Sequence, residues 1–172
     1  MRATCASSTG AQLRGAPAPR KVAMPEVSPQ SVARLTARVR RLWNADAVPI
    51  LATVTDVNGP YTEVVDYYSP SIRRALVAST EEGGETGTSA TEADCGTRMI
   101  PARFVSLAEA IAEARRRGPT GRLNQAFLHY SSGATGQSSL VWDLSFGRNF
   151  DAVRVGAYRT SRAELARLRS SA

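Results

Sequence analysis

The chain is poor in the residue types on which many catalytic and metal sites depend. Its 172 residues include one histidine and two cysteines. A Ser-His-Asp or Cys-His scheme needs a histidine beside its nucleophile, so any such scheme would have to use His129. The two cysteines, Cys5 and Cys95, have no spacing typical of metal ligands. We therefore predict a protein that is not an enzyme and that holds no metal and no cofactor.

Long apolar runs are also missing. The longest apolar stretch, from Ala47 to Ala52, is far shorter than the roughly 20 residues of a membrane-spanning helix. The sequence therefore predicts a soluble protein with no transmembrane segment. The first 21 residues are basic and free of acids, and they lack the apolar centre of a secretory signal. This leader fits a transit peptide, a disordered tail or a start codon placed too early, so the location of the protein stays open.

The net charge of +7 brings nucleic acid into consideration as a partner. Most of the charge is scattered, and the longest basic run is Arg115–Arg117. Such a run at the end of a helix is usually a solvated face that complements the helix dipole. A basic nucleic-acid-associated module remains the alternative function. It would use three arginines of the first expected helix, Arg34, Arg38 and Arg41.

The pattern of the first half predicts one helix followed by three strands. Ser28 and Pro29 are typical of a helix start, and apolar residues then recur at helical spacing as far as Trp43. Runs rich in Val, Thr and Tyr predict strands at residues 47–55, 61–68 and 74–79. Asn58 and Gly59 favour a hairpin turn between the first two strands. The segment from Glu81 to Thr97 is acidic and poor in large apolar residues, which favours a flexible linker.

The second half repeats this order. Ser106 and Glu109 form a capping box, and Gly118 ends the expected helix. Strands are predicted at residues 123–131, 140–146 and 152–158, followed by a last helix from Ser161. An offset of 77 residues (142 − 65) places Val65 on Trp142, Asp66 on Asp143 and Leu51 on Leu128, whereas the helices fit better with one residue less. This repetition indicates a duplication.

The predicted fold class is α+β, with two helix-plus-antiparallel-meander units joined by an acidic loop and followed by a C-terminal helix. The units span residues 28–79 and 101–159. The remaining parts are a disordered leader (1–27), a flexible linker (80–100) and the C-terminal helix (160–172). A helix on one sheet face buries only one side, so the two units would pair or extend a common sheet.

Several segments resemble a known family, the PepSY domains. They are the helix SLAEAIAEAR from Ser106, the strand LVWDLSF from Leu140 and the strand AVRVGAY from Ala152. The segments VVDYYSPS from Val64 and ALVA from Ala75 resemble a second, more divergent copy. The resemblance covers about residues 28–158. It implies a cystatin-like fold with a helix on a sheet, and a non-catalytic role in peptidase inhibition or regulation at the cell envelope.

The leading hypothesis is a module that binds a protein or peptide partner through its sheet face or edge. The candidate binding residues are Asp66, Tyr67, Tyr130 and Asp143. Each aspartate is expected to face away from its aromatic neighbours, toward solvent, and to pair with Arg73, Arg74 or Arg154. A hydrolase that used both carboxylates would need them in one cleft. We expect Trp142, Leu144 and Phe146 in the core, and His129 half-exposed on a strand.

Overall fold

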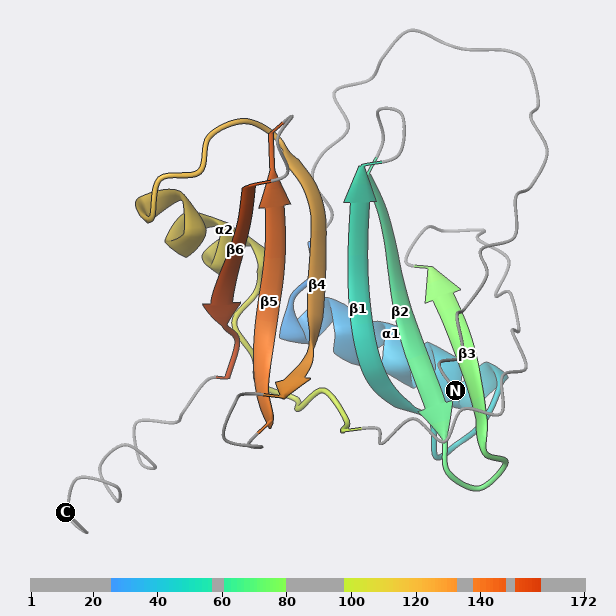
Figure 1. Cartoon of the computed structure of the whole chain (residues 1–172). Coiled ribbons are helices and arrows are strands. Elements are labelled where there is room, and N and C mark those ends of the chain that lie inside the picture. The colour runs from blue at the N-terminus through green and yellow to red at the C-terminus, as the bar shows by residue number, and fades with distance from the viewer. Residues whose placement is uncertain (1–25, 57–60, 80–97, 133–137, 148–150, 159–172) are drawn as a thin grey trace, which may run out of the picture.

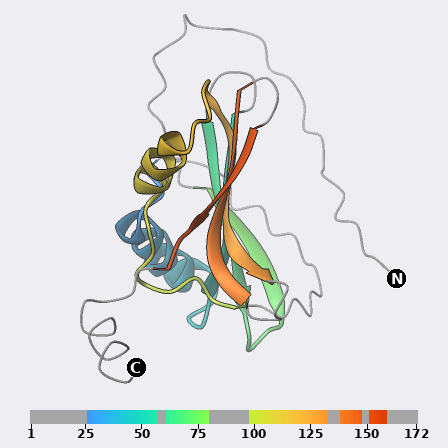
Figure 2. The same cartoon turned by 60° about the vertical axis from the view of Figure 1, so that its left-hand side comes forward.

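A computed structural model describes residues 26–56, 61–79, 98–132, 138–147 and 151–158. These residues form one antiparallel sheet of six strands, in the order β3-β2-β1-β4-β5-β6, together with two helices. Both helices lie on the same face of the sheet (Figures 1 and 2). The elements are α1 (Pro29–Leu42), β1 (Val48–Asp56), β2 (Tyr61–Ser69), β3 (Arg74–Ser79), α2 (Leu107–Arg116), β4 (Leu123–Ser132), β5 (Ser138–Phe146) and β6 (Asp151–Gly156).

The two helices begin where the sequence predicts. The Ser28 side chain caps α1 by accepting a hydrogen bond from the Ser31 amide at 3.2 Å. Ser106 and Glu109 form the expected capping box of α2, in which the Ser106 amide donates to the Glu109 carboxylate at 2.9 Å. Gly118 follows α2 with a φ of 110°, a left-handed conformation that favours glycine.

The predicted assembly into two helix-plus-meander units is wrong. β1 pairs with β4 in antiparallel register, from Ala52 opposite Leu128 to Thr55 opposite Gln125. The two groups of three strands are therefore parts of one continuous sheet. The physical reason is that a three-stranded meander leaves backbone N–H and C=O groups unpaired at its edges, and this pairing satisfies the inner edges of both. Of the two arrangements considered, pairing of units and a common sheet, the structure has the common sheet.

One row of buried side chains crosses the whole sheet on the face that carries the helices. The register places six residues opposite one another in strand order: Ala78, Val65, Ala52, Leu128, Trp142 and Val155. All six are buried. Leu144 and Phe146 also belong to this core, as predicted. The helices close the core with their apolar sides, which for α1 are Val32, Leu35 and Val39.

The offset that relates the two halves is not constant. Val65 corresponds to Trp142 and Ala78 to Val155 with an offset of 77 residues (142 − 65 and 155 − 78). Ala52 corresponds to Leu128 with an offset of 76 (128 − 52). The predicted match of Leu51 with Leu128 is therefore wrong. Leu51 neighbours Ala52 and points to the other face, because successive strand residues alternate.

Several predictions concern residues outside the described ranges. They are the leader, the acidic linker, the Asn58–Gly59 turn, both cysteines and the C-terminal helix. Among the described helices, none has the length and apolar character needed to cross a membrane.

Candidate functional site

The candidate site is the sheet face opposite the helices, which we call the open face. No described helix or strand covers it (Figure 2). Because side chains alternate along each strand, Asp66 and Tyr67 lie on opposite faces although they are neighbours in sequence. The same alternation places Asp143 on the open face and its neighbour Trp142 in the core.

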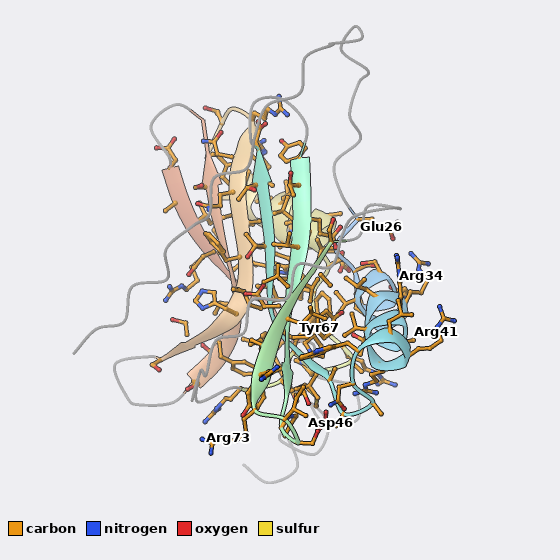
Figure 3. All side chains as sticks on the ribbon, turned by 90° about the vertical axis from the view of Figure 1, so that its right-hand side faces the viewer. Glu26, Arg34, Arg41, Asp46, Tyr67 and Arg73 are labelled. Carbon is orange, nitrogen blue, oxygen red and sulfur yellow. The ribbon has the colours of Figure 1, made fainter. Side chains whose placement is uncertain are left out.

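Tyr67 belongs to the core and not to a binding surface. Its side chain is fully buried, and its hydroxyl lies 3.2 Å from Thr36 Oγ1 of α1 (Figure 3). Thr36 Oγ1 already donates to the Val32 carbonyl at 2.7 Å, so it accepts from Tyr67. Burial raises the pKa of Tyr67 to about 12.

Tyr130 also lies on the helix-covered face. It is half-buried against the core opposite Leu140, and the Arg98 guanidinium lies 5.7 Å from the centre of its ring. The structure therefore separates the four predicted binding residues. The two tyrosines lie on one face of the sheet and the two aspartates on the other.

Asp143 is closed by its neighbours on the open face. Arg154 of β6 holds it with two hydrogen bonds, from Nε to Oδ1 at 2.7 Å and from Nη2 to Oδ2 at 2.8 Å. His129 Nε2 of β4 lies 2.8 Å from Oδ2. The Arg154 guanidinium is the main reason that the pKa of Asp143 lies below its usual range. The predicted pairing of Asp143 with Arg154 is confirmed.

Asp66 has a different environment. In register it lies between Leu51 of β1 and Val77 of β3, and Val64 and Tyr68 flank it along β2. These four neighbours are half-buried. Within the described ranges, no hydrogen bond or ion pair reaches the Asp66 carboxylate, and the predicted pairing with Arg73 or Arg74 is not found. Burial raises the pKa of Asp66 above its ordinary value.

The structure does not bring the two aspartates together. β1 and β4 lie between the strands that carry them. Three strand spacings of roughly 4.8 Å separate β2 from β5 by about 14 Å. The geometric condition for a hydrolytic carboxylate pair, a shared cleft, is therefore not met.

His129 lies half-exposed on β4, as predicted, with 32% of its side chain accessible. Its Nε2 atom faces Asp143, and its Nδ1 atom lies 3.2 Å from the backbone oxygen of Tyr130. Neither ring nitrogen contacts a serine or cysteine in the described part of the chain. Nor do the described residues include a group of three or more His, Cys, Asp or Glu that could hold a metal ion.

The sequence interpretation missed an apolar patch on the open face. Four half-buried side chains form it, and we call them the open-face patch: Leu51, Val64, Val77 and Phe127. Each of them is next in sequence to a buried apolar residue of the core, respectively Ala52, Val65, Leu76 and Leu128. Such apolar pairs in a strand place one side chain on each face, and they were the signal that could have found the patch.

A second surface lies on α1. Arg34, Arg38 and Arg41 are exposed at spacings of four and three residues, so they share one side of the helix, and Figure 3 shows Arg34 and Arg41 pointing away from the sheet. α1 contains no acid, and the described residues provide no ion pair to these three arginines. By contrast, Arg116 and Arg117 of α2 both pair with Glu113.

Comparison of the chain with protein-family models, curated proteins and solved structures finds no match.

Proposed function

We propose that this protein is a non-catalytic module that binds a protein or peptide partner on its open sheet face. The observation that carries the proposal is the open-face patch. An antiparallel sheet with one solvated face normally alternates apolar and polar residues, so the solvated face is polar. Here the face without helices carries Leu51, Val64, Val77 and Phe127. Contiguous apolar surface of this kind is typical of interaction sites.

The resemblance to PepSY domains supports the same class of function. That family implies a helix-on-sheet unit and non-catalytic regulation, often of a peptidase, at the cell envelope. We further infer that the two halves arose by duplication. Support comes from the register: Val65 opposite Ala78 in one half corresponds to Trp142 opposite Val155 in the other, with the same offset of 77 for both members of the pair.

The test is a pair of matched substitutions on the open face. Phe127→Arg places a charge in the patch, whereas Ala152→Arg places the same charge on the exposed β6 edge strand, away from the patch. A protein partner that is cross-linked to the wild-type chain should be lost with Phe127→Arg and kept with Ala152→Arg. Circular dichroism verifies that both variants fold. Equal cross-linking of all three proteins would contradict the proposal.

A second candidate function is association with nucleic acid, which the arginines of α1 favour. Three exposed cations on one side of a helix without acids can each neutralise a phosphate. Replacing Arg34, Arg38 and Arg41 with alanine should weaken retention on DNA or RNA. It should also reduce the slope of log K against log salt by about 2 to 3.

The control for this second candidate removes the same charge elsewhere. Arg74, Arg116 and Arg117 are exposed arginines outside α1, and their replacement with alanine should leave most of the slope unchanged. If the wild-type chain is not retained even at low salt, the candidate is rejected.

A further inference from the structure

Asp66 lies inside the open-face patch. Leu51 and Val77 stand directly opposite it on the two neighbouring strands, and Val64 lies two residues away on the same face of β2. The carboxylate is thus surrounded by carbon-rich side chains on a face that is otherwise suited to burial by a partner. A partner that covered Leu51 and Val77 would also cover Asp66.

An ionised carboxylate that loses water without gaining an opposite charge is destabilised. Burial already raises the pKa of Asp66 in the free chain. A partner with only apolar groups at this position would increase the cost of burial, whereas a cationic group would offset it and add charge-assisted hydrogen bonds. The patch therefore selects against purely apolar partners.

The second aspartate of the open face shows what a satisfied carboxylate looks like in this fold. Asp143 is held by two hydrogen bonds from Arg154 and one contact with His129, all from the neighbouring strands. Asp66 has Leu51 and Val77 at the corresponding neighbouring positions. The cation that Asp143 obtains from its own chain is thus not supplied to Asp66 by these neighbours.

We propose that Asp66 is the anchor for one arginine or lysine side chain of the protein partner, an inference that rests on the proposed function of the open face. The guanidinium or ammonium group binds the carboxylate, and the aliphatic part of the same side chain packs on Leu51 and Val77. Because the chain has a net charge of +7, strongly basic partners are repelled at long range. The recognised segment therefore carries a single basic residue among apolar ones.

The experiment uses the full chain as bait for a displayed library of random ten-residue peptides. Peptides that bind the wild-type chain and not Phe127→Arg are specific for the open face. We expect these peptides to share one arginine or lysine at a constant position. Replacing that arginine with citrulline, which keeps its shape and removes its charge, should weaken binding at least about tenfold.

Two isosteric variants test the anchor itself. With Asp66→Asn, the arginine and citrulline peptides should bind about equally, whereas Asp143→Asn should keep the full discrimination. Open-face peptides that lack a basic residue, or discrimination that survives Asp66→Asn, would overturn the anchor and leave the proposed function intact. If no enriched peptide distinguishes the wild-type chain from Phe127→Arg, both the anchor and the proposed function fail.

Discussion

The indole nitrogen of Trp142 donates a hydrogen bond to the backbone oxygen of Val105 at 2.7 Å. Trp142 is fully buried in β5, and Val105 lies in the segment that leads into α2. The bond therefore ties the centre of the sheet to the start of the helix that covers it. It also satisfies the only polar group of a side chain that the core otherwise holds through apolar contacts.

Trp142→Phe should lower the free energy of unfolding by about 2 to 4 kcal/mol. The variant loses apolar volume and leaves the Val105 carbonyl without its donor. Urea denaturation followed by circular dichroism measures the change. Trp43→Phe, at the half-buried end of α1, is the matched control and should cost less. Equal losses in the two variants would show that the hydrogen bond contributes nothing.

Tyr67→Phe should lower the free energy of unfolding by about 1 kcal/mol at neutral pH, because the hydrogen bond to Thr36 is lost. Burial raises the pKa of Tyr67 to about 12, above the ordinary value of 10.0. A raised pKa in the folded state contributes stability that is present below pH 10 and is lost as the pH rises toward 12.

Denaturation at a series of alkaline pH values measures this dependence. The wild-type chain should lose stability between pH 10 and 12 more steeply than Tyr67→Phe. Tyr68→Phe, which changes the neighbouring residue on the open face, is the control and should follow the wild type. A Tyr67→Phe profile parallel to that of the wild type would refute the prediction.

Asp143→Asn should lower the free energy of unfolding by less than about 1 kcal/mol at neutral pH, since Asp143 and Arg154 are partly exposed. The hydrogen bonds from Arg154 hold the pKa of Asp143 below its ordinary value of 3.8. Stability of this origin is present above pH 3.8 and is lost as the pH falls through the pKa of the folded state.

The difference between wild type and Asp143→Asn should therefore be largest near neutral pH and vanish on acidification. Thermal denaturation between pH 2 and pH 7 measures it. Asp151→Asn, at an exposed position of β6, should differ little from the wild type at any pH. A difference that grows toward low pH would contradict the assignment of the effect to the Asp143 carboxylate.

Gly121→Ala should lower the free energy of unfolding by about 2 kcal/mol or more. Gly121 has a φ of 89°, and an added Cβ would lie 2.8 Å from the Cα atom of Gly147. Gly118→Ala separates the two causes, because Gly118 has a φ of 110° but no atom within 4 Å of the added Cβ. Chemical denaturation should show a smaller loss for Gly118→Ala, and the reverse order would contradict the steric explanation.

The candidate site was predicted only in part. Alternation along the strands placed Asp66 and Asp143 on the face away from the aromatic core, and the partner Arg154 of Asp143 lies on the adjacent strand as expected. Grouping Tyr67 and Tyr130 with these aspartates was wrong, because both tyrosines lie on the helix-covered face. The separation of Asp66 from Asp143 depends on strand order, which no local pattern contains.

The sequence by itself determined where the described helices and strands begin and end, to within about two residues, and which residue types turn inward. Capping hydrogen bonds, the glycine after α2 and strand alternation act over only a few positions of the chain. Only the tertiary structure decided that β1 pairs with β4, since that pairing joins Ala52 to Leu128, 76 residues away (128 − 52). Any free strand edge offers the same backbone groups, so the choice of edge is made by the burial of the whole core. That choice produced one sheet, left its second face open and placed Asp66 among apolar neighbours there.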